Sequence, residues 1–348
     1  MSMKAVVIKA PYTVKVEERP IPKCKEPTDI IVKVRTSGLC GSDLHIYHGH
    51  TAGYDFIMGH EFVGNVFEIG SAIKNFKIGD DVVSPFTTSC GDCFYCSRKQ
   101  TGRCPKGKVY GSEPLDGAQA EYVRVELADS TLYPAPKNIP DECLIVMADI
   151  APTGYYVSQN ANVMLTDYER TQPTTCVVIG CGPVGLCAIT AASSMFSNVY
   201  AIDQVPDRLE EAKKHGAKDA FTLGDNLEEK IKSLTEGRGA DIVLEVVGAE
   251  SALRLAMQLA RPFGIISSCG IHTQAVSLHG PTLYNKNLRL QFGRCPVRAH
   301  FEPALEMVAK HIDTFKPFVQ HSVPIDKAVE YYDLFDKRKI RKTVFTFP

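Results

Sequence analysis

The chain lacks the features that mark several special classes of protein. Its 348 residues carry 39 basic and 40 acidic side chains, so no excess of one charge sign points to nucleic acid as a partner. It contains no basic stripe, no low-complexity segment and no clear internal repeat. Hydrophobic residues make up 44% of it, which is near the globular norm. The composition therefore predicts a globular protein long enough for two domains.

An uninterrupted apolar run long enough to cross a membrane is also missing. The longest apolar stretch, Val177 to Phe196, contains Gly180, Gly182 and Pro183, so a strand, a turn and a helix fit it better. No secretory leader pattern is present at the start, where MSMKAVVIKAP has the pattern of a short strand ended by a proline. We therefore expect a cytoplasmic, reducing environment and no membrane partner.

Cysteine, in contrast, is concentrated in one place. A C-x2-C-x2-C-x7-C cluster is formed by Cys90, Cys93, Cys96 and Cys104. Four thiolates suit a closed tetrahedral zinc, which is a structural site, and three-residue spacing favours a loop around one ion over disulfide pairs. An iron–sulfur site is the alternative. The cluster predicts a structural-zinc lobe over about residues 88–110.

The pattern of apolar residues changes near residue 150. Before it, short strands between Gly and Pro turns predict an all-β, barrel-like region. After it, strands alternate with helices: strands at 176–180, 198–203, 219–223, 241–248 and 264–270, and helices at 183–196, 206–216, 226–237 and 250–260. Beyond about 292 we expect a helix at 302–313, a strand near 316–321, a helix at 325–337 and a final strand. The alternation predicts an α/β domain with a doubly wound parallel sheet.

A glycine-rich turn follows the first strand of this second region. In VVIGCGPVGL, Gly180 permits the tight turn, Gly182 lets the backbone approach a pyrophosphate, and Gly185 allows close packing of helix on strand. Pro183 and Val184, in the same turn, belong to the predicted phosphate site. The motif predicts a bound dinucleotide.

The acidic residue at the end of the next strand indicates which dinucleotide. Asp203 lies about twenty residues after the turn, where a carboxylate accepts hydrogen bonds from ribose hydroxyls. A carboxylate there repels a 2′-phosphate by about 4 kcal/mol at 4 Å in an intermediate dielectric. Arg208, one helical turn further on, can reach the ribose or a phosphate. We expect NAD rather than NADP; the alternative is that Asp203 only caps a turn.

Three further potential metal ligands lie upstream, and each alone has an ordinary interpretation as a buried or surface side chain: Cys40, His60 and Glu61. The order CGSDLH, GHEFVGNV, cysteine cluster and VVIGCGPVGL, at these separations, resembles the zinc-dependent medium-chain alcohol dehydrogenase family. The resemblance covers essentially the whole chain. The CGSD sequence is more similar to the polyol, butanediol and threonine dehydrogenase branch than to the ethanol enzymes.

The resemblance implies a fold and a second metal site. The fold would be a discontinuous GroES-like catalytic domain, residues 1–152 completed by 293–348, and a Rossmann NAD-binding domain at 153–292. The active site would lie between the two domains. The catalytic zinc would be held by Cys40, His60 and, in MADIAPTG, Asp149, with Glu61 beside the metal.

Charge bears on the role of Glu61. A Cys40 thiolate, a neutral His60 and an Asp149 carboxylate bring Zn²⁺ to zero net charge, whereas adding Glu61 makes the site −1 and weakens the Lewis acid. We therefore expect Glu61 to be an exchanging ligand that leaves when substrate arrives.

The family pattern also assigns a path for the proton. It matches Ser42 to a hydroxyl relay and His45 to a terminal imidazole. The ordinary interpretations are a turn residue for Ser42 and a surface histidine for His45.

Weaker assignments complete the predicted site. Phe86 matches a wall of the substrate pocket, although it could equally be ordinary core. The nicotinamide half is expected at the carboxyl edge of the sheet, near Val247, Gly248, Gly270 and Ile271. Lys342 falls where the family often has an arginine that contacts the cofactor phosphate.

The sequence thus predicts an oxidoreductase that transfers a hydride from a secondary alcohol or polyol to NAD, giving a ketone or aldehyde, with two zinc ions per subunit. A homotetramer is favoured, and a dimer is the alternative. A metal-free quinone or enone reductase of the same superfamily and a non-enzymatic dinucleotide-binding protein are the competing interpretations, although neither needs the predicted zinc ligands and relay.

Overall fold

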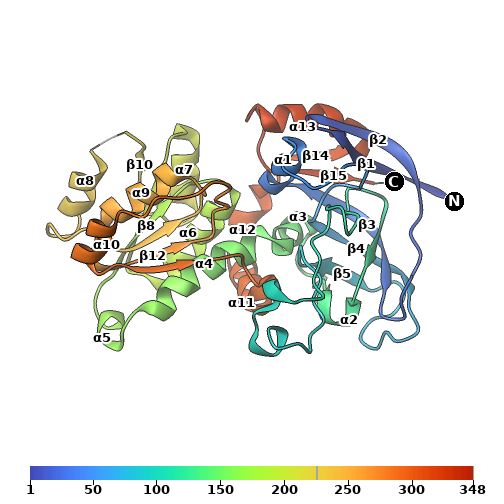
Figure 1. The fold of residues 1–348 in the computed structure, drawn as a ribbon, viewed down its shortest axis with the longest axis horizontal. Coiled ribbons are helices and arrows are strands. Elements are labelled where there is room, and N and C mark those ends of the chain that lie inside the picture. Colours follow the sequence, from blue (N-terminus) through green and yellow to red (C-terminus); the bar gives the residue numbers. More distant parts are fainter. Residues whose placement is uncertain (225, 348) are drawn as a thin grey trace. The chain divides into compact units, whose positions relative to one another are not determined.

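The computed structural model describes residues 1–224 and 226–347, which form two compact units (Figure 1). Unit 1 contains Met1–Asp149 and the segment that begins at Pro296, and unit 2 is Ile150–Cys295. Unit 1 is therefore discontinuous in sequence. Among the described residues, no helix combines the length and hydropathy that a bilayer span needs.

Unit 2 is built on a six-stranded parallel sheet in the order β10-β9-β8-β11-β12-β13. The strands are β8 (Thr175–Ile179), β9 (Asn198–Asp203), β10 (Asp219–Thr222), β11 (Ala240–Glu245), β12 (Ala260–Ser268) and β13 (Arg289–Phe292). The order reverses between β8 and β11, as in Rossmann folds, so the crevice at the carboxyl ends of these strands is the expected ligand site.

Helices flank this sheet on both faces (Figure 1). They are α4 (Ile150–Met164), α5 (Asp167–Arg170), α6 (Pro183–Met195), α7 (Pro206–Lys214), α8 (Leu227–Ser233), α9 (Glu250–Leu259) and α10 (Gly280–Lys286). The predicted parallel α/β architecture is confirmed. The patterns at 198–203 and 183–196 match β9 and α6, because an apolar strand and a Pro at the first helical turn are strong local signals.

Unit 1 is mainly antiparallel sheet of the GroES-like type. A seven-stranded sheet has the order β14-β15-β3-β4-β5-β7 with β6 paired to β3, and β1 pairs with β2 in a separate ribbon. The strands are β1 (Ser2–Ala10), β2 (Thr13–Pro20), β3 (Ile30–Leu39), β4 (Phe62–Ile69), β5 (Asp81–Ser84), β6 (Tyr122–Val125), β7 (Tyr133–Pro134), β14 (His321–Pro324) and β15 (Thr343–Thr346).

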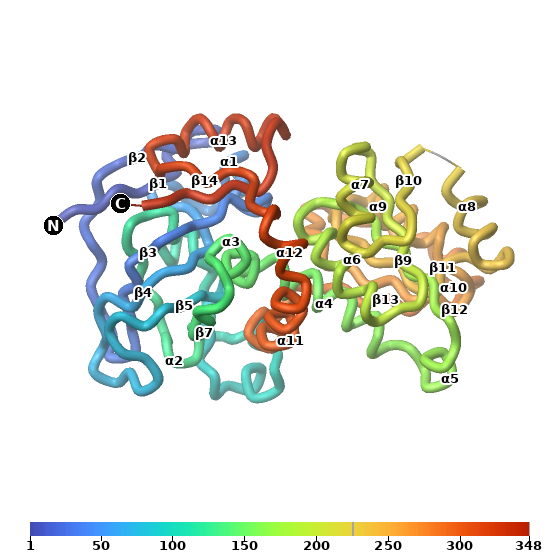
Figure 2. Tube along the Cα trace, turned by 180° about the vertical axis from the view of Figure 1, so that it is seen from behind, coloured from blue at the N-terminus to red at the C-terminus, as the bar shows by residue number. Residues whose placement is uncertain are grey.

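Short helices connect these strands, and the segment after Pro296 returns to unit 1. The helices are α1 (Gly41–Tyr47), α2 (Ala128–Thr131), α3 (Asp141–Leu144), α11 (Val297–Lys310), α12 (Ile312–Phe315) and α13 (Ala328–Asp336), and the 3₁₀ turns are η1 (Cys96–Arg98), η2 (Thr101–Arg103), η3 (Ile145–Ala148), η4 (Lys316–Phe318) and η5 (Ile325–Lys327). Figure 2, drawn from behind, shows α13 beside β1 and β2. Strand β15 pairs with β3, which completes the sheet.

Two predictions in this last segment were displaced. The strand expected near 316–321 is the turn η4 followed by β14, because Pro317 has no N–H to donate to a ladder. The helix expected from 302 begins at Val297, so Pro303 lies inside α11 rather than at its start. In unit 2, α10 and β13 were not predicted, since α10 has no buried residue and β13 no fully buried one to mark them.

Candidate active site and metal centres

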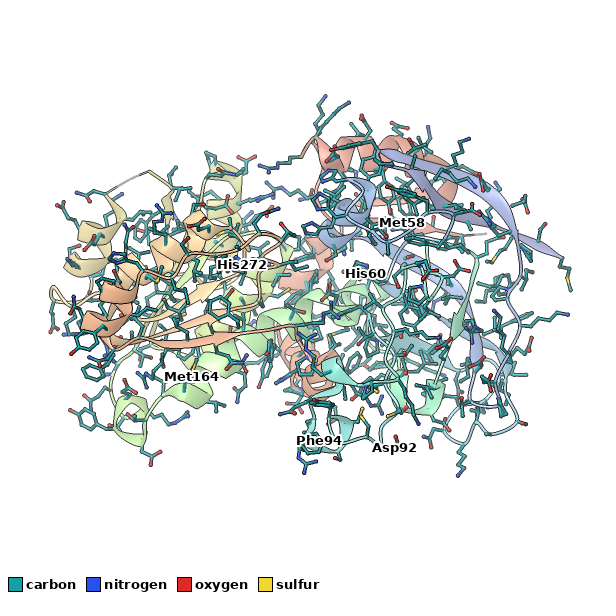
Figure 3. The ribbon with its side chains drawn as sticks, viewed as in Figure 1. Met58, His60, Asp92, Phe94, Met164 and His272 are labelled. Atoms are coloured by element: carbon teal, nitrogen blue, oxygen red, sulfur yellow. The ribbon has the colours of Figure 1, made fainter. Side chains whose placement is uncertain are left out.

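The four clustered cysteines converge in the lobe that contains η1 and η2. The four sulfurs lie within 4.8 Å of one another, with Cys104 Sγ 3.5 Å and Cys96 Sγ 4.0 Å from Cys90 Sγ. A tetrahedral zinc with Zn–S bonds of about 2.3 Å needs sulfurs about 3.8 Å apart, so the spacing fits. None of the four forms a disulfide. In Figure 3, yellow sulfur atoms lie beside Asp92 and Phe94, which mark this lobe.

Backbone N–H groups donate hydrogen bonds to two sulfur atoms of the lobe. The N–H of Cys96 points to Cys93 Sγ at 3.5 Å, and the N–H of Cys90 to Cys104 Sγ at 3.4 Å. The backbone hydrogen bond from Cys96 lowers the pKa of Cys93 to about 7, whereas burial raises that of Cys96 to about 12. A cation at the centre favours thiolate at every position, so a closed S4 metal centre suits the lobe.

A second cluster gathers residues that are far apart in sequence: Cys40, His60, Glu61 and Asp149. Cys40 lies between β3 and α1, His60 and Glu61 immediately precede β4, and Asp149 follows η3. Their ligand atoms lie within 4.8 Å of one another. Asp149 Oδ2 is 4.0 Å from Cys40 Sγ and 3.5 Å from His60 Nε2. The structure thus brings together all four residues that were predicted around the catalytic zinc.

Unpartnered atoms in this cluster fit a bound cation. His60 Nε2 and Glu61 Oε1 are buried, and among the described residues neither has a hydrogen-bond partner. A buried polar atom without a partner costs about 1–3 kcal/mol. Sulfur, imidazole nitrogen and carboxylate oxygen are a zinc donor set, so these residues fit that metal.

The ionisation of the cluster reflects crowded opposite charges. Burial by itself lowers the pKa of His60, but the carboxylates of Asp43 and Asp149 outweigh it and raise that pKa well above its usual value. Burial raises the pKa of the Cys40 thiol, and Glu61 raises it further. Protons therefore compete with a metal for these atoms, as is usual for zinc ligands.

Asp43 contacts two of the ligand residues, His60 and Cys40, by hydrogen bonds. Its Oδ1 lies 3.1 Å from His60 Nδ1, and its Oδ2 accepts the backbone N–H of Cys40 at 2.9 Å. When His60 donates its Nδ1–H to Asp43, its Nε2 atom carries a lone pair, and this is the atom that lies among the other ligands.

Two supports of Asp43 were not predicted. Gln119 Nε2 lies 3.3 Å from Asp43 Oδ2 and donates to the carbonyl of Gly38 at 3.1 Å, while Tyr332 Oη donates to Gln119 Oε1 at 2.7 Å. Both side chains are fully buried. No local motif marks them, because Tyr332 is 213 residues from Gln119 along the chain and only the fold joins them.

Lys342 has a different partner from the cofactor phosphate that the family pattern implied. It is 2% exposed, and its ammonium pairs with Glu61 Oε2 and lies 3.5 Å from the carbonyl of Leu39. Gly38 makes room for the pair, since a Cβ there would lie 2.0 Å from Glu61 Oε2. Burial alone lowers the pKa of Lys342, but Glu61 and Cys40 outweigh it and raise the pKa. The ammonium therefore offsets the charge of Glu61.

The relay and pocket residues lie next to these ligands in the chain or in space. Helix α1 carries Ser42 in its first turn and His45 one turn further on. Burial, aided by His50 and His48, lowers the pKa of His45. The ring of Phe86 meets that of His60 edge-on at 6.2 Å between centroids, which places it at the cluster rather than in remote core.

The glycine turn has the geometry that a pyrophosphate site requires. Gly180 has φ +101, and a Cβ on Gly185 would lie 1.9 Å from the carbonyl oxygen of Gly180, so both positions exclude side chains. Nothing lies within 4 Å of a Cβ built on Gly182, the residue before α6. Pro183 begins that helix, and Val184 follows it.

Asp203 ends β9 and is 7% exposed. Its Oδ2 accepts the N–H of Cys181 at 2.7 Å, inside the glycine turn, and its Oδ1 accepts the N–H of Val205 at 2.9 Å. Arg208 Nη1 lies 3.7 Å from Oδ2. The carboxylate therefore fixes the glycine turn and the start of the segment that follows β9.

The residues predicted for the nicotinamide half follow β11 and β12. Val247 and Ile271 are 52% and 55% exposed. A Cβ on Gly270 would lie 2.1 Å from the backbone nitrogen of Gly248, so the two segments touch through their backbones. Both lie at the carboxyl ends of their strands.

Comparison with known proteins agrees with the two units and the site. Residues 26–137 match the alcohol dehydrogenase GroES-like domain family, and residues 183–310 match the zinc-binding dehydrogenase family. Zinc-type alcohol dehydrogenase B of Aspergillus flavus is 47% identical over 347 residues, which are 99% of this chain and 81% of that protein. The sorbitol dehydrogenase of Bacillus subtilis is 33% identical over 282 residues, 78% of this chain and 76% of that protein.

Solved structures share the whole fold. The alcohol dehydrogenase TADH from Thermus sp. ATN1 superposes with a TM-score of 0.91 at 35% identity, over 99% of each chain. An alcohol dehydrogenase from E. coli CFT073, complexed with the cofactor NADH, gives a TM-score of 0.87 at 25% identity over 99% of each chain. With this agreement in sequence, fold and ligand set, the chain belongs to the zinc-type medium-chain alcohol dehydrogenase family.

Proposed function

We propose that this protein is an NAD-dependent zinc alcohol dehydrogenase that oxidises a secondary alcohol or polyol to a ketone or aldehyde, reversibly. The observation that carries the proposal is the second cluster, in which distant residues converge and His60 Nε2 is buried without a hydrogen-bond partner among the described residues. A bound cation gives such a buried and unsatisfied set of ligand atoms a physical reason to exist.

Cys40, His60 and Asp149 would hold the catalytic zinc, which when bound supplies Lewis acidity to the alcohol oxygen. The Cys40 thiolate and the Asp149 carboxylate together carry the two negative charges that neutralise Zn²⁺. Glu61 and Lys342 neutralise each other, since Lys342 pairs with Glu61 Oε2. Among the described residues the other oxygen, Oε1, has no hydrogen-bond partner, so it is available to a metal whose fourth position is empty. We propose that Glu61 binds the metal between turnovers and leaves when substrate arrives.

Ser42 and His45 would carry the alcohol proton away from the reacting centre. A hydroxyl both accepts and donates, so Ser42 can pass a proton without changing charge. Burial lowers the pKa of His45, and this keeps its imidazole neutral and able to accept a proton near neutral pH.

NAD would bind along the glycine turn, with Gly180, Gly182, Pro183, Val184 and Gly185 around the pyrophosphate. Asp203 supports NAD over NADP, since its buried carboxylate repels a 2′-phosphate. The NADH in the E. coli CFT073 relative supports the same cofactor. Replacing Asp203 with Ala should narrow the ratio of NAD to NADP turnover; an unchanged ratio would exclude the ribose role.

A polyol or secondary alcohol is the substrate class that the relatives support. One relative, the sorbitol dehydrogenase of Bacillus subtilis, is named for a polyol substrate. Phe86 would form an aromatic wall of the substrate pocket, since its ring contacts that of His60. We further propose a cytoplasmic homotetramer, with a dimer as the alternative. Light scattering on the purified protein distinguishes the two.

Zinc analysis and an alcohol panel together test the function. We expect two zinc ions per chain, one in each cluster, and NADH formation with at least one secondary alcohol or polyol. One or no zinc, without turnover of any alcohol, would favour a metal-free reductase. The rate of NADH formation, followed by its absorbance with each alcohol of the panel, then ranks the alcohols as substrates.

A further inference from the structure

Glu245, the last residue of β11, is a buried carboxylate that the zinc chemistry does not use. Its Oε1 accepts the backbone N–H groups of Val247 at 2.8 Å and Gly248 at 2.7 Å. Its Oε2 accepts the hydroxyl of Ser268 at 2.7 Å and lies 3.2 Å from His272 Nε2. The side chain is completely buried. One carboxylate therefore collects four donors.

These donors come from two neighbouring segments of unit 2. Val247 and Gly248 follow β11, whereas Ser268 ends β12 and His272 comes four residues later. Because β11 and β12 are adjacent and parallel, both segments leave the sheet at its carboxyl edge. Figure 3 labels His272 in this part of unit 2. Glu245 thus joins the two segments as a single bridge.

The bridge holds the segments in backbone contact. Gly248 has φ +80, and a Cβ on it would lie 2.5 Å from the backbone nitrogen of Ile271. The side chains of Val247 and Ile271 stay about half exposed beside this contact. Two exposed apolar side chains next to a tight backbone junction form a surface suited to a flat ring.

The charge of Glu245 is balanced in an unusual way. Among the described residues, the basic side chain that contacts it is His272, which is charged only when protonated, and the other three contacts are neutral donors. Glu169, in α5, is the opposite case, because it pairs with Arg261 and Arg289 at the amino ends of β12 and β13. The two arginines give Glu169 charge-assisted hydrogen bonds, whereas three of the four contacts of Glu245 are neutral.

His272 adds an unsatisfied atom to the bridge. Its Nε2 faces Glu245, and its buried Nδ1 has no hydrogen-bond partner among the described residues. Both bridged segments leave the sheet at its carboxyl edge, where a parallel sheet of this strand order binds its ligand. The junction is therefore a fitting place for a nicotinamide ring.

We propose that Glu245 is a positioning residue for the nicotinamide half of NAD, acting through the junction of the Val247–Gly248 and Gly270–Ile271 segments that it bridges. This inference rests on the proposed use of NAD. It assigns Glu245, Ser268 and His272 a role in orienting the ring, while the adenosine half is held separately by the glycine turn and Asp203.

Two ligands separate this role from simple folding. NADH carries both halves of the cofactor, whereas ADP-ribose lacks the nicotinamide. In the zinc-loaded protein, Glu245→Ala should weaken NADH binding about tenfold or more, which is about 1.4 kcal/mol, and leave ADP-ribose binding within about twofold. Isothermal titration calorimetry measures both constants without turnover.

Glu169→Ala is the matched control, because it removes a carboxylate bridge at the other end of the same sheet. It should lower the thermal midpoint while both affinities stay within about twofold of wild type. Glu245→Gln should recover part of the NADH affinity, since its amide oxygen still accepts from Val247 and Gly248. Ser268→Ala removes one donor and should cause a smaller loss of NADH affinity, again without loss of ADP-ribose affinity. If Glu245→Ala does not fold, Glu245→Gln and Ser268→Ala test the positioning role in its place.

Equal loss of NADH and ADP-ribose in the Glu245 and Ser268 variants, or no loss of NADH, would overturn the positioning role alone. Failure of the wild-type protein to bind NADH would overturn the proposed cofactor as well. Selective loss of NADH in those variants and not in Glu169→Ala supports the inference.

Discussion

The two metal-type clusters of unit 1 have the same size and opposite construction. In each, four ligand atoms lie within 4.8 Å of one another. The cysteine lobe takes all its ligands from residues 90–104 and hydrogen-bonds two of its sulfurs to its own backbone. The second cluster spans residues 40–149 and leaves His60 Nε2 and Glu61 Oε1 without hydrogen bonds among the described residues.

The surroundings of the two clusters also differ, since the second cluster is supported by buried residues from distant segments and the cysteine lobe lies at the surface. Asp43, Gln119 and Tyr332 form a chain of hydrogen bonds behind the second cluster, and Lys342 balances Glu61. The lobe is a surface feature, with Phe94 61% exposed beside it. The comparison teaches that a local, self-satisfied cluster suits stability, whereas a cluster assembled from distant elements and kept under-coordinated suits reaction. Four substitutions test this division.

Cys40→Ser should have the largest effect. Removing a ligand of the second cluster forfeits Lewis acidity worth several kcal/mol, so turnover should fall about a thousandfold or more. NADH absorbance measures the rate, and calorimetry should find NADH affinity nearly unchanged. Cys24→Ser, a half-buried cysteine outside both clusters, is the control and should keep its activity. Full activity in Cys40→Ser would remove the distinction between the clusters.

Lys342→Met tests the charge balance of the second cluster. It leaves the Glu61 carboxylate buried without its partner, and breaking such a pair costs about 3–5 kcal/mol. Urea unfolding should therefore show a large loss of stability, most of which Lys342→Met/Glu61→Gln should restore. The control is Lys4→Met, which breaks an exposed, solvent-screened pair with Asp326 and should lower stability far less than Lys342→Met. A small, unrescued loss in Lys342→Met contradicts the proposed neutralisation.

Cys96→Ser tests the lobe. We expect the zinc content to fall from two ions to one and the catalytic unit to lose roughly 2–3 kcal/mol, a shift of about 5–10 °C in thermal midpoint. Turnover per folded molecule should stay close to wild type. Cys40→Ser makes the reciprocal comparison, since it should also lose one zinc but far less stability. If Cys96→Ser instead stops turnover at full stability, the roles of the two clusters are reversed.

Asp43→Asn should have the smallest effect. The amide holds His60 and Cys40 less firmly, and outer-shell changes of this kind weaken metal affinity about 10–100-fold. Competition with a chromogenic chelator measures the loss, which should affect one of the two zinc ions. Asp92→Asn, an exposed change next to Cys90, should alter the lobe affinity by no more than about threefold. Equal effects of the two changes would argue against a special support for the second cluster.

The sequence predicted the parts of the molecule whose signals are local. The cysteine spacing, the glycine turn and the strand–helix alternation each depend on neighbours within about twenty residues. They led to the lobe, α6 and β9, and through the family pattern to Cys40, His60 and Asp149. Among the displaced elements, the strand expected near 316–321 had Pro317 against it and no compensating periodicity.

Other features could not be predicted, because they depend on contacts between distant segments. Lys342 and Glu61 are 281 residues apart, and nothing in either local sequence indicates a buried ion pair. The bridge of Glu245 to Ser268 and His272 likewise exists only once β11 and β12 lie side by side. A buried charge must find its partner somewhere, but the sequence does not say where.

The amino-acid sequence by itself determined the chemistry that this protein can hold, since ligand type and spacing are properties of the chain. The tertiary structure alone decided which charges are neutralised and which polar atoms are left unpaired. The physical reason is that metal-ligand preference is carried by individual side chains, whereas desolvation and charge pairing depend on every group that packing brings within a few ångströms.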